Sequence, residues 1–73
     1  MHYTTRLKDM REDHDLTQKE IAAILKIRQE QYHRYESGKR LLPIDKLKEL
    51  CKYYNVSADY LLGLSDDPKP LKK

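Results

Sequence analysis

The chain has 73 residues, of which 37% are charged and 38% hydrophobic, and a formal net charge of +3 at pH 7. A chain this short has room for one domain with a small, mostly local core. The single cysteine, Cys51, excludes an internal disulfide, the polar start at residues 1–5 lacks the apolar segment of a signal peptide, and no apolar run is long enough to span a membrane. We therefore expect a cytoplasmic protein with no membrane association.

Helix is the expected secondary structure throughout. The chain has only two glycines and three prolines, and its long uninterrupted stretches are rich in Lys, Glu, Leu, Arg and Gln, which favour helix. The composition predicts an all-α fold. Leu7 and Met10 recur at helical spacing between charged residues, which predicts a first helix from Thr5 to about Asp13.

A second helix is expected to begin at Thr17. Thr17 and Glu20 have the spacing of a capping box, in which the threonine oxygen accepts from a backbone N–H and the glutamate reaches back. The apolar stripe of this helix comprises Ile21, Ala22, Ile24 and Leu25, and a break follows near Lys26.

The third helix follows that break and ends at Gly38, a residue suited to the left-handed conformation that closes a helix. Two short helices can cross closely only where the crossing residue is small, and Ala22 meets this demand. Tyr32 and Tyr35 could be stacking platforms for single-stranded nucleic acid, but their spacing favours an inner, core-facing position beside Ile27.

Two further helices complete the predicted fold. After a loop over 39–42 and Pro43, one helical face of the fourth helix carries Ile44, Leu47, Leu50, Cys51 and Tyr54. On this face Cys51 is expected to be a buried thiol. Asn55 can close this helix, and Ser57 can cap a short fifth helix that runs through Leu62 and ends at Gly63. From Ser65 onward no pattern could bury anything, so we expect a domain over 1–64 and a flexible tail over 65–73.

The positive charge is concentrated between Lys26 and Arg40. This window holds five of the 15 Lys and Arg residues and two of the 12 Asp and Glu residues, which leaves ten of each for the rest of the chain. A clustered excess of this kind is typical of a surface that faces phosphates, although an ordinary solvated face can also show it.

The outer face of the third helix has the chemistry needed to read duplex DNA. Gln pairs with adenine and Arg with guanine through two hydrogen bonds each, and the first turn of a helix reaches deepest into the major groove. The residues expected to read bases are Arg28, Gln29, Glu30, His33 and Arg34. Those expected to hold phosphates are Gln18, Lys39 and Arg40. His33 could equally be a plain exposed residue. Glu30 would repel phosphates unless it accepts from a cytosine amino group or neutralises Arg34.

In combination and in this order, four motifs resemble the helix-turn-helix family typified by phage lambda repressor, Cro and the Xre-type regulators. The resemblance covers about residues 6–64 and is carried by Leu16-Thr17-Gln18-Lys19-Glu20-Ile21-Ala22, Arg34-Tyr35-Glu36-Ser37-Gly38-Lys39-Arg40, Pro43 and Val56-Ser57-Ala58-Asp59-Tyr60-Leu61-Leu62-Gly63. It implies a compact five-helix lambda-repressor-like domain with its helix-turn-helix over 18–36. It further implies that Gln18 contacts the DNA backbone and braces Gln29, and that Arg11 pairs with Glu36 as a structural ion pair.

Two positions depart from the family pattern. Lys26 stands where the turn usually has glycine, so a non-glycine residue must accept a positive φ or the turn must adjust, at a cost of roughly 1 kcal/mol. Arg28 replaces the usual small hydroxyl cap of the recognition helix, which weakens that cap by about 0.5–2 kcal/mol and adds a base or phosphate contact.

Other classes of function are less well supported by the sequence. We expect no enzyme, cofactor or small-molecule ligand, because paired carboxylates, a glycine-rich phosphate loop and a nucleophile with its base are all missing from the pattern. One cysteine and three scattered histidines predict no metal site. A protein-interaction module of the same fold, such as an antitoxin, is the main alternative. The expected partner is a double-stranded DNA operator bound by a homodimer, with Tyr53, Tyr60, Leu64 and the tail as candidate dimer contacts.

Overall fold

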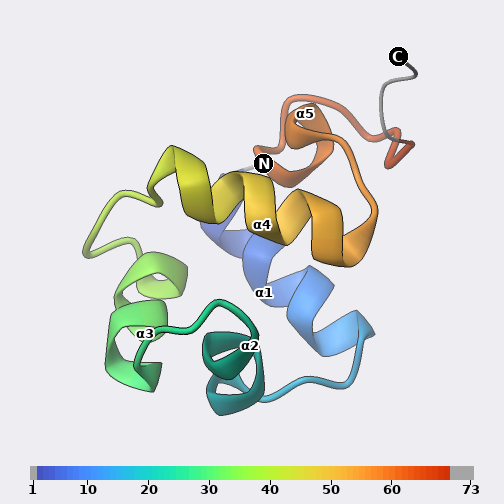
Figure 1. Cartoon of the computed structure of the whole chain (residues 1–73). Coiled ribbons are helices and arrows are strands. Elements are labelled where there is room, and N and C mark those ends of the chain that lie inside the picture. The colour runs from blue at the N-terminus through green and yellow to red at the C-terminus, as the bar shows by residue number, and fades with distance from the viewer. Residues whose placement is uncertain (1, 70–73) are drawn as a thin grey trace.

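The computed structural model describes residues 2–69 and contains five helices and no strand within them. The helices are α1 (Tyr3–Asp13), α2 (Gln18–Ile24), α3 (Gln29–Ser37), α4 (Ile44–Tyr54) and α5 (Ala58–Leu61). Figure 1 shows α1 crossing the middle of the molecule, with α2 and α3 together on one side of it and α4 and α5 on the other. The predicted all-α, five-helix fold is confirmed. No helix among residues 2–69 is long and apolar enough to cross a membrane.

One hydrophobic core joins all the elements around α1. The buried side chains come from both halves of the fold and are Leu7, Met10, Ile21, Ala22, Leu25, Tyr32, Leu50, Tyr54, Val56 and Leu61. Because α1 supplies two of them and contacts both α3 and α5, it is the element that fixes the two halves relative to one another.

The start of α1 differs from the sequence prediction. The helix begins at Tyr3, two residues before the expected Thr5, because His2 acts as its N-cap. The Nδ1 atom of His2 accepts from the Thr4 backbone N–H at 3.2 Å and lies 2.8 Å from the Thr4 hydroxyl. Histidine is not among the residues that normally cap helices, so the capping rules could not find this start.

The predicted start of α2 and the turn after it are both confirmed. The Thr17 hydroxyl accepts from the Glu20 N–H at 3.1 Å, and the Glu20 carboxylate accepts from the Thr17 N–H at 2.9 Å. Lys26 adopts a positive φ of 58°, so the turn keeps its left-handed conformation without glycine. Ala22 is 2% exposed, as expected of a small residue at the crossing of α2 and α3.

For two residues of the predicted apolar stripes, the prediction that they are buried is wrong. Ile44 is 77% exposed and Ile24 is 39% exposed. Side chains lean toward the N-terminus of their helix, so Ile44, the first residue of α4, projects past the helix start instead of over the core. Ile24 ends a seven-residue helix that already packs on the core through Ile21 and Ala22.

The rest of α4 and the chain reversals agree with the sequence. Leu50 and Tyr54 are buried and Cys51 is partly buried, which raises the pKa of its thiol. Asn55 closes α4 with a φ of 57°, and Gly63 follows α5 with a φ of 79°. Ser57 caps α5 by accepting from the Tyr60 N–H at 3.1 Å.

Residues 65–69 contact the body of the domain, beyond the predicted boundary at Leu64. The Ser57 N–H donates to the Pro68 carbonyl at 3.1 Å, and the Arg6 guanidinium lies 3.6 Å from the Asp66 carboxylate. Arg6 is buried and sits over the ring of the partly buried Tyr60 at 3.9 Å. The predicted tail residues 70–73 lie outside the described residues.

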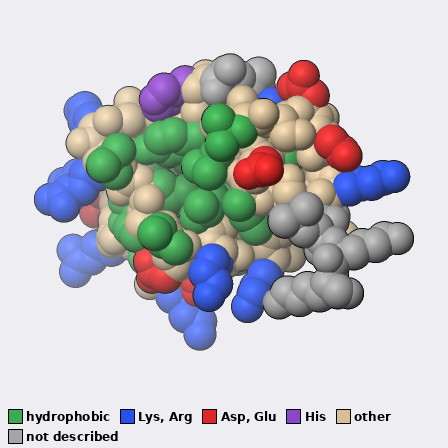
Figure 2. Space-filling model, turned by 90° about the horizontal axis from the view of Figure 1, so that it is seen from above, with side chains coloured by type: hydrophobic (Ala, Val, Ile, Leu, Met, Phe, Trp, Pro, Cys, Tyr) green, Lys and Arg blue, Asp and Glu red, His purple; other side chains and the backbone are tan. Residues whose placement is uncertain are grey.

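Hydrophobic side chains gather on the face that carries α4 and α5. Figure 2 looks down on this face and shows a green patch at its middle. The large exposed hydrophobic residues on or next to these helices are Leu41, Ile44, Tyr53 and Leu64. On the side of the molecule that carries α2 and α3, the exposed side chains of α3 are mostly polar or charged.

Candidate nucleic-acid interface

One face of α3 is turned toward the core and the opposite face toward solvent. Tyr32 and Tyr35 are buried, which confirms the core-facing prediction for both. The five residues predicted to read bases are all exposed: Arg28, Gln29, Glu30, His33 and Arg34. Tyr32 joins the hydrophobic core, and the polar side chains are left on the outside.

Two shallow grooves flank the exposed side of α3. One is lined by Gln18, Gln29, Glu30, His33, Arg34 and Lys39. The other is lined by Arg28, Glu30, Gln31, Arg34, Tyr35 and Arg40. Together these linings contain every residue that the sequence assigned to DNA contact, drawn from three separate segments of the chain. The fold therefore gathers the predicted set onto one surface.

The turn at the end of α3 returns two basic residues to this surface. Gly38 takes the left-handed conformation with a φ of 83°, as predicted, and the Arg40 N–H donates to the Arg34 carbonyl at 3.1 Å. A side chain in that conformation would be strained, so glycine favours the reversal. Lys39 and Arg40 consequently reach one groove each instead of pointing away from the helix.

The N-terminus of α3 carries no side-chain cap. Arg28 occupies the N-cap position and makes no hydrogen bond to the backbone of the first turn. The first N–H groups of a helix have no partner within it and carry partial positive charge. An uncapped N-terminus beside two grooves thus favours the approach of an anion such as a phosphate.

Glu30 and Arg34 form no ion pair among the residues that the structure describes, although they are four apart on α3. Both side chains line both grooves. The Glu30 carboxylate is therefore available to accept from a donor in a groove, which was one of its two predicted roles.

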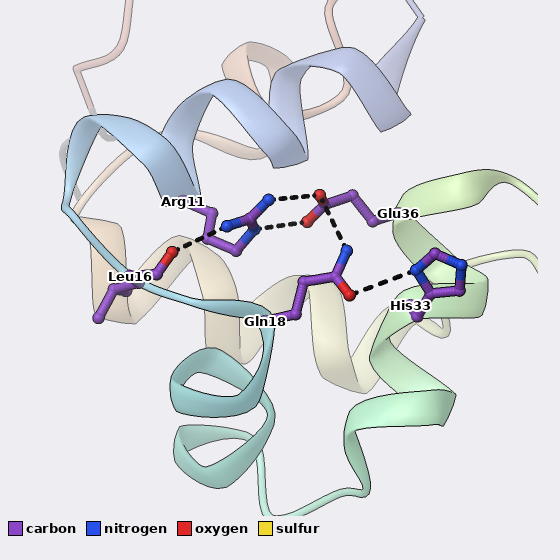
Figure 3. Close-up of polar contacts among 5 residues, drawn as sticks. All are labelled: Arg11, Leu16, Gln18, His33 and Glu36. Atoms are coloured by element: carbon purple, nitrogen blue, oxygen red, sulfur yellow. Dashed lines mark hydrogen bonds and ion pairs between the residues drawn. The ribbon is translucent and has the colours of Figure 1, made fainter.

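A bidentate ion pair anchors the other end of α3, as the family resemblance implied. The Arg11 Nε and Nη2 atoms on α1 each donate to the Glu36 carboxylate at 2.9 Å, and Arg11 Nη1 donates to the Leu16 carbonyl at 2.8 Å (Figure 3). The two side chains are only 13% and 6% exposed. Burial by itself would raise the pKa of Glu36, but the bonds from Arg11, aided by the Gln18 amide, outweigh it and lower that pKa. The same carboxylate raises the pKa of Arg11.

Gln18 extends this ion pair to the solvent side of α3. Its Nε2 atom donates to Glu36 at 3.3 Å, and its Oε1 atom lies 3.3 Å from Nδ1 of His33 (Figure 3). The resemblance implied that Gln18 braces Gln29. Among residues 2–69, the hydrogen bonds of its side chain run to Glu36 and His33 instead, while Gln29 only shares the groove with it. The brace to Gln29 is therefore corrected for the free protein, because a buried carboxylate attracts the amide more strongly than a neutral side chain.

Lys8 was not predicted to belong to this surface. This α1 residue lines a third hollow together with Gln18, His33 and Ser37. One signal could have found it: Lys8 lies three residues before Arg11 and so shares a helix face with the residue that pairs with Glu36.

Comparison with known proteins identifies this arrangement. Residues 4–66 match the family described as helix-turn-helix domain. The chain belongs to this helix-turn-helix family. The domain superposes on the crystal structure of a transcriptional regulator from Listeria innocua with a TM-score of 0.80 and 29% identity, over 85% of this chain and 58% of that one. The resemblance to Xre-type regulators is thereby confirmed.

Similar proteins from bacteria include both regulators and an antitoxin. The domain is 43% identical over 68 residues to the HTH-type transcriptional regulator YobD of Bacillus subtilis (strain 168), covering 93% of this chain and 61% of YobD. It is 42% identical over 64 residues to the HTH-type transcriptional regulator ImmR of the same organism, covering 88% of this chain and 50% of ImmR. It is 35% identical over 57 residues to the antitoxin PezA of Streptococcus pneumoniae serotype 4, covering 78% of this chain and 36% of PezA. The chain thus spans less than two thirds of each of these proteins.

Proposed function

We propose that this helix-turn-helix domain binds double-stranded DNA in a sequence-specific manner and acts as a transcriptional regulator, most simply a repressor, with no catalytic activity of its own. The observation that carries the proposal is that the exposed polar side chains of α3 line two grooves together with Gln18 of α2 and the basic residues Lys39 and Arg40, beside an N-terminus of α3 that has no side-chain cap. Two similar proteins named HTH-type transcriptional regulators support it.

The proposed contacts divide into two kinds. Arg28, Gln29, Glu30, His33 and Arg34 read base edges in the major groove, where each base pair presents a distinct set of donors and acceptors. Gln18, Lys39 and Arg40 bind phosphates and set the position of α3 without reading sequence. The cytoplasm is the proposed compartment.

The proposed DNA-bound form is a homodimer on a partly palindromic operator, with half-sites about one helical turn apart. A single domain with few base contacts rarely reaches useful affinity. Exposed apolar side chains on the α4 and α5 side, Leu41, Ile44, Tyr53 and Leu64, support a contact between copies there. Light scattering that finds a monomer both free and on DNA would reject the dimer while leaving DNA binding intact.

Selection from a random duplex library tests the function directly. We expect one enriched motif, repeated with inverted symmetry. Binding to that motif should weaken with salt, with a slope of log affinity against log salt of about −0.9 for each phosphate contacted. A chain that enriches no motif and shows no salt-sensitive binding would contradict the proposal.

Two substitutions test the division of contacts. Gln29→Ala should lose about 1–3 kcal/mol on the selected motif and relax one base position, whereas Lys39→Ala should weaken all duplexes alike and reduce the salt slope by about one. Equal losses from both variants on every sequence would show that the two kinds of contact are not separate.

A protein-interaction role is the second candidate, and the similarity to an antitoxin favours it. An apolar contact with a protein partner would depend little on salt, in contrast to phosphate binding. Titration of the chain with duplex at several salt concentrations therefore distinguishes the two roles.

A further inference from the structure

The hydrogen bonds that link the buried ion pair to the solvent side of α3 fix the orientation of the Gln18 amide. Glu36 is a carboxylate whose pKa is lowered, so it can only accept hydrogen bonds. The Gln18 amide next to it must then turn its NH₂ group toward Glu36, which is the bond found at 3.3 Å. The reverse orientation would place a carbonyl oxygen against a carboxylate.

This orientation decides what faces His33. With the NH₂ group of Gln18 on Glu36, its carbonyl oxygen is the atom 3.3 Å from His33 Nδ1. A carbonyl oxygen only accepts, so Nδ1 bonds to it only when Nδ1 carries the proton. In a neutral imidazole the other nitrogen, Nε2, is then an acceptor with a free lone pair. Figure 3 shows that nitrogen on the side of the ring away from Gln18.

The position of His33 puts this acceptor on the DNA-facing surface. His33 is exposed and lies four residues after Gln29, so the two share one face of α3, and both line the same groove. In the major groove, adenine and cytosine present amino groups that donate, whereas guanine and thymine present carbonyl oxygens at the corresponding positions. An acceptor at Nε2 therefore favours adenine or cytosine.

We propose that His33 reads the amino group of an adenine or cytosine through Nε2, and that Gln18 is a positioning residue which fixes the required tautomer through its bond to Glu36. This inference rests on the proposed DNA-binding function and adds the class of base that is read. The charged groups around the ring are Lys8 and Arg11 on α1, Glu30, Arg34 and Glu36 on α3, and Lys39 after it.

The tautomer can be tested in the free protein. Nitrogen-15 NMR of the wild-type chain, at a pH that keeps the ring neutral, should show the His33 proton on Nδ1. Gln18→Ala should remove that bias while leaving the fold intact. A proton on Nε2 in the wild type, or a tautomer that Gln18→Ala does not change, would overturn the positioning role.

Base preference is tested with duplexes that carry each of the four bases at every position of the selected motif. The wild type should prefer adenine or cytosine at one position by about fivefold, the value of one hydrogen bond. His33→Asn keeps a donor near Nδ1 but has no atom at Nε2, so it should lose this preference. His33→Gln places an amide near Nε2 that can donate or accept, so it should bind all four bases more evenly. Gln18→Ala should reduce the ratio between bases in addition to any uniform loss of affinity.

The outcomes separate this inference from the proposed function. A uniform loss in His33→Asn with the ratio between bases unchanged would mean that His33 only contacts phosphate, which overturns the inference and leaves sequence-specific binding standing. Absence of salt-sensitive binding to any duplex by the wild type would overturn the proposed function, and the base-reading role with it.

Discussion

At the start of α2, Thr17 and Glu20 close a reciprocal capping box, whereas at the start of α3 the Arg28 side chain makes no bond to the backbone. The two helices are neighbours in one motif, yet only the first is secured at its own N-terminus. α3 is held at its inner face by two tyrosines and at its far end by the buried pair between Glu36 and Arg11. The stability of α3 is thus supplied away from the end proposed to meet DNA.

The largest expected effect comes from breaking the anchor of α3. Arg11→Ala should lower the free energy of unfolding by about 3 kcal/mol, because it leaves the Glu36 carboxylate buried without its charged partner. Urea unfolding measures the change. The double variant Arg11→Met with Glu36→Gln removes both charges and should recover much of the loss. A loss below about 0.5 kcal/mol in the single variant would mean that α3 is held by its tyrosines alone.

The same pair predicts how stability depends on pH. The pKa of Glu36 is lowered below its ordinary value of 4.5, so the unfolded chain binds a proton at Glu36 more readily than the folded one. The stabilisation from Glu36 is therefore complete above about pH 4.5 and is lost as the pH falls through the folded-state pKa. Urea unfolding across this range should show a smaller acid-induced loss for Glu36→Gln than for the wild type.

The contact between the two helices ranks next. Ala22→Leu should lower the free energy of unfolding by about 1–3 kcal/mol, because a larger side chain at the crossing forces α2 and α3 apart. Ala23→Leu is the matched control: it adds the same side chain at the neighbouring exposed position and should change stability by less than about 0.5 kcal/mol. Equal losses would indicate a general effect on α2 instead of a packing effect at the crossing.

Removing the cap of α2 and adding one to α3 should have opposite effects on stability. Thr17→Ala should cost about 1 kcal/mol, or roughly 4–8 °C in Tm for a domain of this size. Arg28→Ser should add a cap to α3 and raise stability by up to a similar amount, while it weakens DNA binding. Thermal unfolding and duplex titration measure the two effects. An Arg28→Ser variant that is both more stable and better at binding would show that the open N-terminus serves no purpose.

The smallest expected effect lies in the turn between the helices. Lys26→Gly should raise the free energy of unfolding by about 0.5–1 kcal/mol, because glycine adopts the positive φ at this position without strain. Its own greater freedom in the unfolded chain offsets part of the gain. Lys19→Gly, within α2, should destabilise by about 1 kcal/mol and serves as the opposite control.

Local rules predicted most of the fold. The Thr17 cap, the left-handed Gly38, the end of α4 at Asn55, and the buried Leu50 and Tyr54 each follow from a few neighbouring residues. The family resemblance added the pairing of Arg11 with Glu36, which a separation of 25 residues hides from any local pattern.

The failures have a common physical origin in contacts between distant segments. Ile44 fits the apolar periodicity of α4 but has no neighbouring element over it, and periodicity cannot tell where such an element ends. Arg6 and the stretch 65–69 meet only in three dimensions, where a charged residue is buried over an aromatic ring. At the candidate site, the residue types were enough to predict which polar side chains of α3 are exposed. The partner of Gln18 could not be predicted in this way, because it depends on the distance from Gln18 to Glu36, which only the fold determines.

The separation of inner tyrosines from outer polar residues on α3 has a consequence for how such a domain can change. Arg28, Gln29, Glu30 and Arg34 lie outside the core, so exchanging them would change the proposed base contacts and leave the buried residues in place. His33 is the exception, because it shares a hydrogen bond with Gln18 and through it with the buried pair. New target preferences should therefore arise freely at four positions of the helix, and at the fifth only when residue 18 changes as well.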